Sequence, residues 1–203
     1  SLAHLDLSEL EDAIPIHIKS IILISNAELH LSTQTLQRLK EESPCLFVHH
    51  NHAHNLNTLR KIYPPKSCEM LFIRGNGVGY WGLADNTGES LYRPQSNILS
   101  CGIFALRGKL DLSNRPEITK INTNWLSTLE QQEKYTNGKR PSTGFYTRKL
   151  FAAIKERRPK LRVCTLGFKP DASYWNSRTV THHDYVFESN ELIRSAIARH
   201  HYP

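Results

Sequence analysis

The chain has 203 residues, of which 39% are hydrophobic and 22% charged. This length and composition predict one folded domain with a sizeable core, and they exclude disordered and collagen-like chains. No apolar run approaches the roughly 18 residues that a membrane span requires, and the acidic N-terminal stretch lacks the pattern of a signal peptide. The net charge of +7 favours anionic partners such as nucleotides, nucleic acid or an acidic membrane surface.

The four cysteines, at positions 45, 68, 101 and 164, are far apart in the sequence and include no CxxC pair. Neither a zinc site nor a disulfide framework is indicated by this spacing. Cys45 and Cys164 lie in apolar runs, and we expect them to be buried as small hydrophobic residues. We therefore expect free thiols and a reducing compartment.

Short apolar runs bounded by turn residues alternate along the chain with stretches of helical pattern. The expected strands are residues 21–24, 45–48, 70–73, 98–106 and 161–166. The expected helices are residues 33–42, capped by Ser32 or Thr33, and 144–158. Because the strands are continuously apolar, helices should cover both faces of their sheet. The pattern predicts an α/β fold, with a single Rossmann-like, doubly wound domain over residues 1–203.

Two polar stretches, residues 84–97 and 108–140, are expected to be surface excursions, the second with a short helix over 125–135. The residues just after the strands are small and polar, as a binding rim requires, because ligands of open α/β sheets bind beyond the carboxyl ends of the strands. Gly75, Gly77 and Gly79 lie in this region but lack the GxGxxG spacing of a dinucleotide site.

Three histidines, His50, His52 and His54, would share one face if this segment were extended, which raises the hypothesis of a metal site. No carboxylate or cysteine lies close to them in the sequence, and clustered histidines are often simply at the surface. We therefore expect no metal.

Two further motifs have a structural and a functional interpretation. Pro141-Ser142-Thr143-Gly144 precedes the second helix, where its hydroxyls and free N–H groups form either a helix cap or a phosphate site. His183 and Glu188 follow near the end of the sequence. Taken alone, they are compatible with a surface histidine before a terminal helix.

In this order, the segments resemble the signature motifs of the sialyltransferases. The matching segments are Ile24 to Ala27 with Asn51 to Ala53, Pro141 to Gly144 with Gly167-Phe168, and the His-x4-Glu-like pair His183 and Glu188. The similarity covers roughly residues 20–55 and 140–194. Ser25 and Glu28 stand where the family has glycines, and the paired cysteines of the family are missing.

The resemblance implies the sialyltransferase-type variant of the GT-A arrangement. It also implies inverting, metal-independent transfer of an acidic sugar from a CMP donor to a glycan hydroxyl, without a cofactor. The sugar is either sialic acid or 3-deoxy-octulosonate. The implied roles are general base for His183, nucleotide binding for Asn26, Asn51, Ser142, Thr143 and Gly144, and organisation of the histidine loop for Glu188.

The expected partners are the CMP-sugar and a glycan acceptor, for example of a bacterial capsule or lipooligosaccharide. The enzyme would then be cytoplasmic, with peripheral contact to the inner membrane. The alternative is a non-catalytic nucleotide- or RNA-binding module on a related α/β fold. The basic cluster at residues 155–162 is typical of a helix end and is not interleaved with aromatic residues, which counts against RNA.

Overall fold

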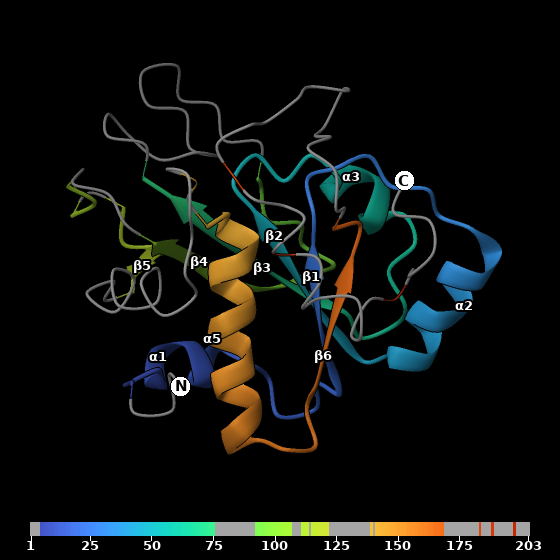
Figure 1. The fold of residues 1–203 in the computed structure, drawn as a ribbon, viewed down its shortest axis with the longest axis horizontal. Helices are drawn as coiled ribbons and strands as arrows, with labels where there is room; N and C mark the ends of the chain where they lie inside the picture. The colour runs from blue at the N-terminus through green and yellow to red at the C-terminus, as the bar shows by residue number, and fades with distance from the viewer. Residues whose placement is uncertain are drawn as a thin grey trace.

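The computed structural model describes residues 5–75, 92–106, 111–113, 115–121 and 141–168, together with positions 139, 183, 188 and 197. Within this part of the chain, strands form one sheet in the order β5-β4-β3-β2-β1-β6, and all neighbours are parallel (Figure 1). The strands are β1 (Ser20–Ile24), β2 (Cys45–His50), β3 (Cys68–Arg74), β4 (Leu99–Leu106), β5 (Ile118–Lys120) and β6 (Arg162–Leu166). The helices are α1 (Ser8–Ala13), α2 (Thr33–Glu42), α3 (Leu56–Arg60) and α5 (Thr143–Arg157).

The predicted strands and helices agree with β1, β2, β3, β4, β6, α2 and α5 to within two residues at each end. The α/β fold is therefore confirmed, and its all-parallel sheet is compatible with a Rossmann-like domain. The prediction missed α1, α3 and β5. The expectation that residues 108–140 form only a surface excursion is wrong at β5, because Ile118 is buried in the core. The helix expected over 125–135, and residues 77 and 79, lie outside the described residues.

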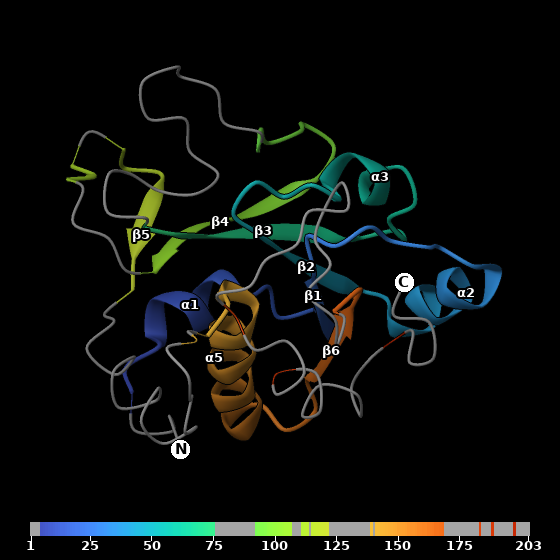
Figure 2. The ribbon, with the colours of Figure 1, turned by 45° about the horizontal axis from the view of Figure 1, so that its top comes forward.

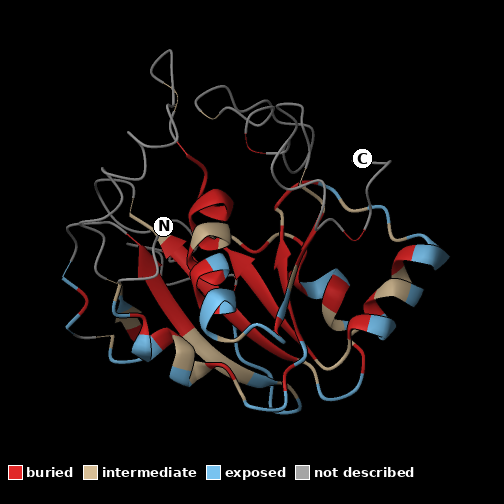
Figure 3. Cartoon of the chain, turned by 60° about the horizontal axis from the view of Figure 1, so that its bottom comes forward, coloured by how far each residue is buried: buried red, intermediate tan, exposed pale blue. Residues whose placement is uncertain are grey.

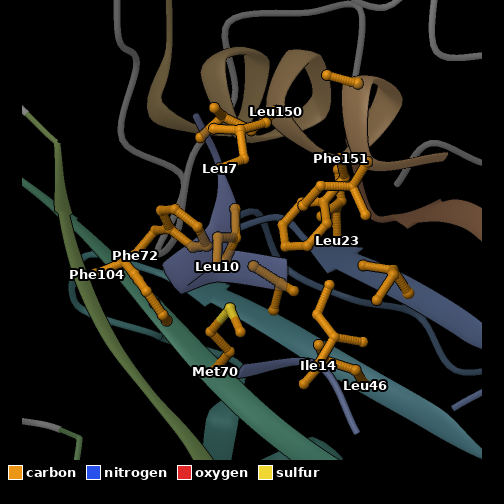
Figure 4. Packing of buried hydrophobic residues seen from close by; sticks show 14 of the residues in the cluster. Leu7, Leu10, Ile14, Leu23, Leu46, Met70, Phe72, Phe104, Leu150 and Phe151 are labelled. Carbon is orange, nitrogen blue, oxygen red and sulfur yellow. The ribbon is translucent and has the colours of Figure 1, made fainter. Parts of the chain in front are cut away.

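Helices cover both faces of the sheet, and this explains the continuously apolar strands (Figure 2). Helices α1 and α5 lie on one face, where Ile21 and Leu23 of β1 join their core cluster. Helices α2 and α3 lie on the other face, toward which Ile22 and Ile24 point. In the first of these layers, Leu10 of α1 and Phe151 of α5 pack over the sheet (Figure 4).

The direction in which the chain builds the sheet reverses at β1. Strands β1 to β5 are added one beside the other, and the chain then returns to place β6 on the opposite side of β1. Ile24 is paired with Leu166 in the register, and the Ser25 N–H donates to the Leu166 carbonyl at 3.0 Å. Ligands of open α/β sheets bind at such a switch point, beyond the carboxyl ends of the strands.

Helix α5 begins at this same end of the sheet, because it runs back from the carboxyl ends toward the start of β6 (Figure 1). Its first five residues, 143–147, are all buried, whereas its last turn is largely exposed (Figure 3). The amino-terminal turn of α5 and the ends of β1, β2, β3 and β6 therefore form one region.

All four cysteines are free thiols, and Cys45 and Cys164 are buried in the apolar core as expected. Among the described residues, no helix combines the length and the apolar character needed to cross a bilayer.

Candidate functional site

Asn26, after β1, uses both ends of its side-chain amide to join the ends of β1 and β2. Its Nδ2 donates to the His50 carbonyl at 2.8 Å, and its Oδ1 accepts from the His54 N–H at 3.0 Å. Asn55 reinforces this connection, because its Nδ2 donates to the carbonyls of Ser25 and Ala27 at 2.6 and 2.8 Å. Asn26, expected in the nucleotide pocket, therefore shapes this region through bonds to the backbone.

Asn51 connects β2, β3 and α5. Its φ of 51° lies in the left-handed region, which asparagine tolerates better than most residues. The Arg74 N–H can only donate, so the atom 3.1 Å from it is Asn51 Oδ1, and this orients the amide. Asn51 Nδ2 then donates to Thr143 Oγ1 at 3.2 Å. Two residues of the predicted nucleotide site, which are 92 positions apart, are thus in direct contact.

Ser142 and Glu188 form the second long-range contact of the site. The Glu188 carboxylate accepts from the Ser142 N–H at 2.8 Å and from its hydroxyl at 2.6 Å, and Glu188 is only 2% exposed. Ser142 Oγ also accepts from the Phe145 N–H at 3.1 Å, which caps α5. A carboxylate is favoured here because the first turn of a helix carries partial positive charge.

Thr143 and Gly144 retain hydrogen-bond donors at the start of α5. The N–H groups of these first-turn residues have no partner inside the helix. The Thr143 hydroxyl accepts from Asn51, and within the described residues its own proton has no acceptor. Ser142, in contrast, is fully engaged by Glu188 and the helix cap. Ser142 and Thr143 were both expected to bind phosphate. Within the described residues, the Thr143 hydroxyl proton can still be donated to a ligand, whereas the Ser142 hydroxyl proton is donated to Glu188.

Gly144 is required by the close approach of Phe168. A Cβ atom at position 144 would overlap the Phe168 ring, and Gly167, with φ of +83°, directs the chain into this contact. The residues that follow β6 therefore pack against the first turn of α5.

His49 and His50 are buried and held by hydrogen bonds. His50 Nδ1 donates to the Ile24 carbonyl at 2.7 Å, and its Nε2 is bonded to Thr147 Oγ1 at 2.7 Å. Burial lowers the pKa of His50 to about 4. His49 is bonded through Nε2 to the Tyr63 hydroxyl, and burial, followed by the charges of His50 and Arg60, lowers its pKa to about 3. Both rings are neutral at pH 7 and serve the fold.

The hypothesis that His50, His52 and His54 share an extended face is wrong. Strand β2 ends at His50, and the positive φ angles of Asn51 and Ala53 turn the chain there. The rings of His52 and His54 lie 5.5 Å apart, while both nitrogens of His50 are already bonded. In the part of the chain that the structure describes, no three His, Cys, Asp or Glu residues are grouped as metal ligands would be.

His183 is half-buried and lies five residues before Glu188, whose carboxylate is bonded to Ser142 at the start of α5. The residues between them lie outside the described part. The pairing of Glu188 with Ser142 has no local signal in the sequence, because the two residues are 46 positions apart.

The basic cluster at residues 155–162 lies at the opposite end of α5 from the site. Arg157 forms an ion pair with Glu11, and Arg162 Nη2 lies 2.7 Å from Glu42 Oε1. The cluster therefore serves as a helix end, with one partly exposed ion pair to Glu11 and one pair between exposed Arg162 and the buried carboxylate of Glu42. Near the start of α5 the sequence analysis missed Arg74, whose position at the end of a predicted strand was the available signal.

Comparisons of the chain with protein-family models, with curated proteins and with solved structures found no match. The functional argument therefore depends on the residues and contacts described above.

We expect the Ser142–Glu188 contact to be energetically coupled. Glu188→Ala should lower the free energy of unfolding by about 2–3 kcal/mol, because hydrogen bonds to a charged group are lost and Ser142 is left unpaired. Ser142→Ala combined with Glu188→Ala should cost less than the sum of the two single changes by about 1 kcal/mol or more, measured by urea unfolding.

The matched control for this cycle is Ser32→Ala. Ser32 caps α2 through the Thr35 N–H at 3.1 Å, without a buried carboxylate. It should cost about 1 kcal/mol and add independently to Glu188→Ala. Additive behaviour of Ser142 and Glu188 would contradict the coupling.

The buried histidines predict a loss of stability in acid. The pKa values of His49 and His50 fall from 6.5 to about 3 and about 4, so between pH 6.5 and 4 the unfolded chain binds more protons than the native protein. Stability should therefore decrease as the pH falls, with up to about 1.4 kcal/mol per pH unit from each histidine. Urea unfolding of wild type and His50→Gln from pH 7 to 4.5 checks this. An equally steep pH dependence in His50→Gln would contradict the assignment for His50.

Proposed function

We propose that the protein is a glycosyltransferase of sialyltransferase type, which transfers an acidic sugar from a CMP donor to a glycan hydroxyl with inversion. The supporting observation is that a series of contacts links the segments with a sialyltransferase-like motif at the carboxyl end of the sheet, near the switch point. Ser25 bonds to β6, Asn51 to Thr143, and Ser142 to Glu188. A chance set of short motifs has no reason to converge on the end of the sheet where α/β folds bind ligands.

The leaving CMP gains negative charge on its phosphate as the bond to the sugar breaks. Fixed N–H and O–H donors stabilise such charge where they are already oriented toward it. In this proposal the donors are the backbone N–H groups of Thr143 and Gly144 with the Thr143 hydroxyl. Ser142 has a positioning role, because its N–H and hydroxyl are bonded to Glu188. Asn51 orients Thr143 and contributes to nucleotide binding.

The acceptor hydroxyl is a weak nucleophile and needs a base to remove its proton in the transition state. His49 and His50 are unsuited to this role, because they are buried, hydrogen-bonded and low in pKa. We assign the base to His183, which lies five residues before the Glu188 that is bonded to Ser142 at the start of α5. The acceptor class, a bacterial capsule or lipooligosaccharide glycan met at the inner membrane, rests on the resemblance alone.

We expect CMP to bind with an affinity that is the same with and without EDTA. Thr143→Val should weaken binding about tenfold, the effect of one lost hydrogen bond to a charged group. The matched control is Thr33→Val, because Thr33 is the first residue of α2 as Thr143 is of α5. Calorimetry with CMP, CDP and UMP measures this. Absence of CMP binding, or binding only with metal, would refute the proposed function.

Replacement of the proposed base should lower turnover without loss of the nucleotide. His183→Ala is expected to lower the rate of transfer by roughly 10²–10⁴-fold, the usual contribution of a general base, with CMP affinity little changed. The measurement is CMP release from CMP-sialic acid and CMP-octulosonate over a panel of glycan acceptors. His182→Ala is the control and should have a mild effect.

Three other outcomes are informative. A large effect of His182→Ala alone would shift the assignment by one residue. If neither variant loses activity, the base lies elsewhere and the mechanism is wrong. CMP binding by the wild type without transfer to any acceptor would favour the non-catalytic nucleotide-binding alternative.

A further inference from the structure

Arg74 is a cation fixed beside the start of α5. It ends β3, and its backbone N–H donates to Asn51 Oδ1 at 3.1 Å. Its Nη1 donates to the Pro141 carbonyl at 2.7 Å, and its Cζ lies 5.2 Å from the centre of the Tyr146 ring. The hydrogen bond and the ring contact hold the guanidinium in place, so little conformational freedom remains to be lost when an anion binds.

The groups around Arg74 are suited to an anion. Asn51 links the Arg74 backbone to Thr143, whose hydroxyl proton has no acceptor in the described part of the chain. Thr143 is only 6% exposed, so a ligand at this hydroxyl would be largely shielded from water. The carboxylate of the site, Glu188, is bonded twice to Ser142.

The chemistry of the proposed donor requires two anion-binding groups close together. In sialic acid and 3-deoxy-octulosonate the carboxylate is attached to the anomeric carbon, which is also the carbon bonded to the phosphate of CMP. A group that recognises the carboxylate must therefore lie beside the groups that bind the phosphate. Arg74 satisfies this requirement, because its guanidinium donates to the carbonyl of Pro141, two residues before Thr143, and lies over the ring of Tyr146, three residues after it.

We infer that Arg74 is the specificity-determining residue for the donor, and that it binds the carboxylate of the transferred sugar while Thr143 and Gly144 bind the phosphate. The inference rests on the proposed function and extends it to the choice of sugar. The planar guanidinium matches a carboxylate through two parallel hydrogen bonds, which a lysine cannot reproduce. CMP itself and CMP-linked neutral sugars lack this carboxylate, so they gain only the less direct attraction of Arg74 for the phosphate.

The test compares two ligands by calorimetry: CMP, and a CMP-sialic acid analogue fluorinated at C3 that binds without being transferred. Arg74→Met keeps the length of the side chain and its contact with Tyr146. It should weaken binding of the analogue about 10- to 100-fold and weaken binding of CMP by a clearly smaller factor, because CMP loses only the less direct attraction of the phosphate. Arg74→Lys should lie between wild type and Arg74→Met. Lys160→Met, an exposed cation beyond the far end of α5, removes the same charge and should leave both affinities unchanged.

A second arm uses only wild-type protein and so does not depend on the folding of a variant. The methyl ester of the same analogue, which lacks the carboxylate charge, should bind wild type as weakly as the free acid binds Arg74→Met. Equal affinity of ester and acid would overturn the inference. Equal loss of CMP and analogue in Arg74→Met would also overturn it, because Arg74 would then only hold Pro141. The results for wild-type protein also separate failure of this inference from failure of the proposed function. If the wild-type protein binds the analogue and CMP with equal affinity, Arg74 has no role in the choice of sugar, and the proposed function stands. If wild type binds neither, the proposed function itself fails.

Discussion

The pairing of one buried carboxylate, that of Glu188, connects position 188 to the start of α5. Glu188 is almost completely shielded from water, and an unpaired carboxylate in such a position would be strongly destabilising. Two hydrogen bonds from Ser142 and the positive end of α5 remove that cost. Position 188, five residues after His183, is thereby held at the start of α5. Ile197 supplies a second anchor, because its N–H donates to the Thr165 carbonyl at 2.9 Å and its side chain is buried against β6.

The polar residues of the site divide into those that complete the fold and those that can still receive a ligand. Asn26 and His50 bond to backbone carbonyls at both strand ends, and Ser142 bonds to Glu188 and its own helix. The Thr143 hydroxyl accepts from Asn51, and within the described residues its proton can still be donated to a ligand. The division follows from hydrogen-bond geometry and cannot be inferred from residue type, since serine and threonine are adjacent in the same motif. A motif locates a site, but the partners of each atom determine which residues can act on a substrate.

Much of the fold could be predicted from the sequence because the buried strands are continuous apolar runs. The short elements could not: α3 and β5 have five and three residues, too few for a period to be visible. The strand order was also beyond prediction, because it depends on pairing between distant segments. For the same reason the individual motifs could be recognised, whereas the contacts of Ser142 with Glu188 and of Asn51 with Thr143 could not. His50, His52 and His54 would share one face only if this segment were extended, and residues in left-handed conformations follow β2 directly.

The positive net charge of the chain has less bearing on its site than the composition suggests. The densest cations, at residues 155–162, lie at the carboxyl end of α5 and beyond it, whereas the candidate site lies at its amino end. The helix has 15 residues, which at about 1.5 Å per residue is roughly 22 Å. The Debye length at physiological ionic strength is about 8 Å, so charges at that separation are almost completely screened from each other. Recognition of an anion at the start of α5 must therefore depend on fixed groups in direct contact with it. Under the proposed function Arg74 would be such a group, because its position is set by Pro141 and Tyr146 and not by the overall charge of the surface.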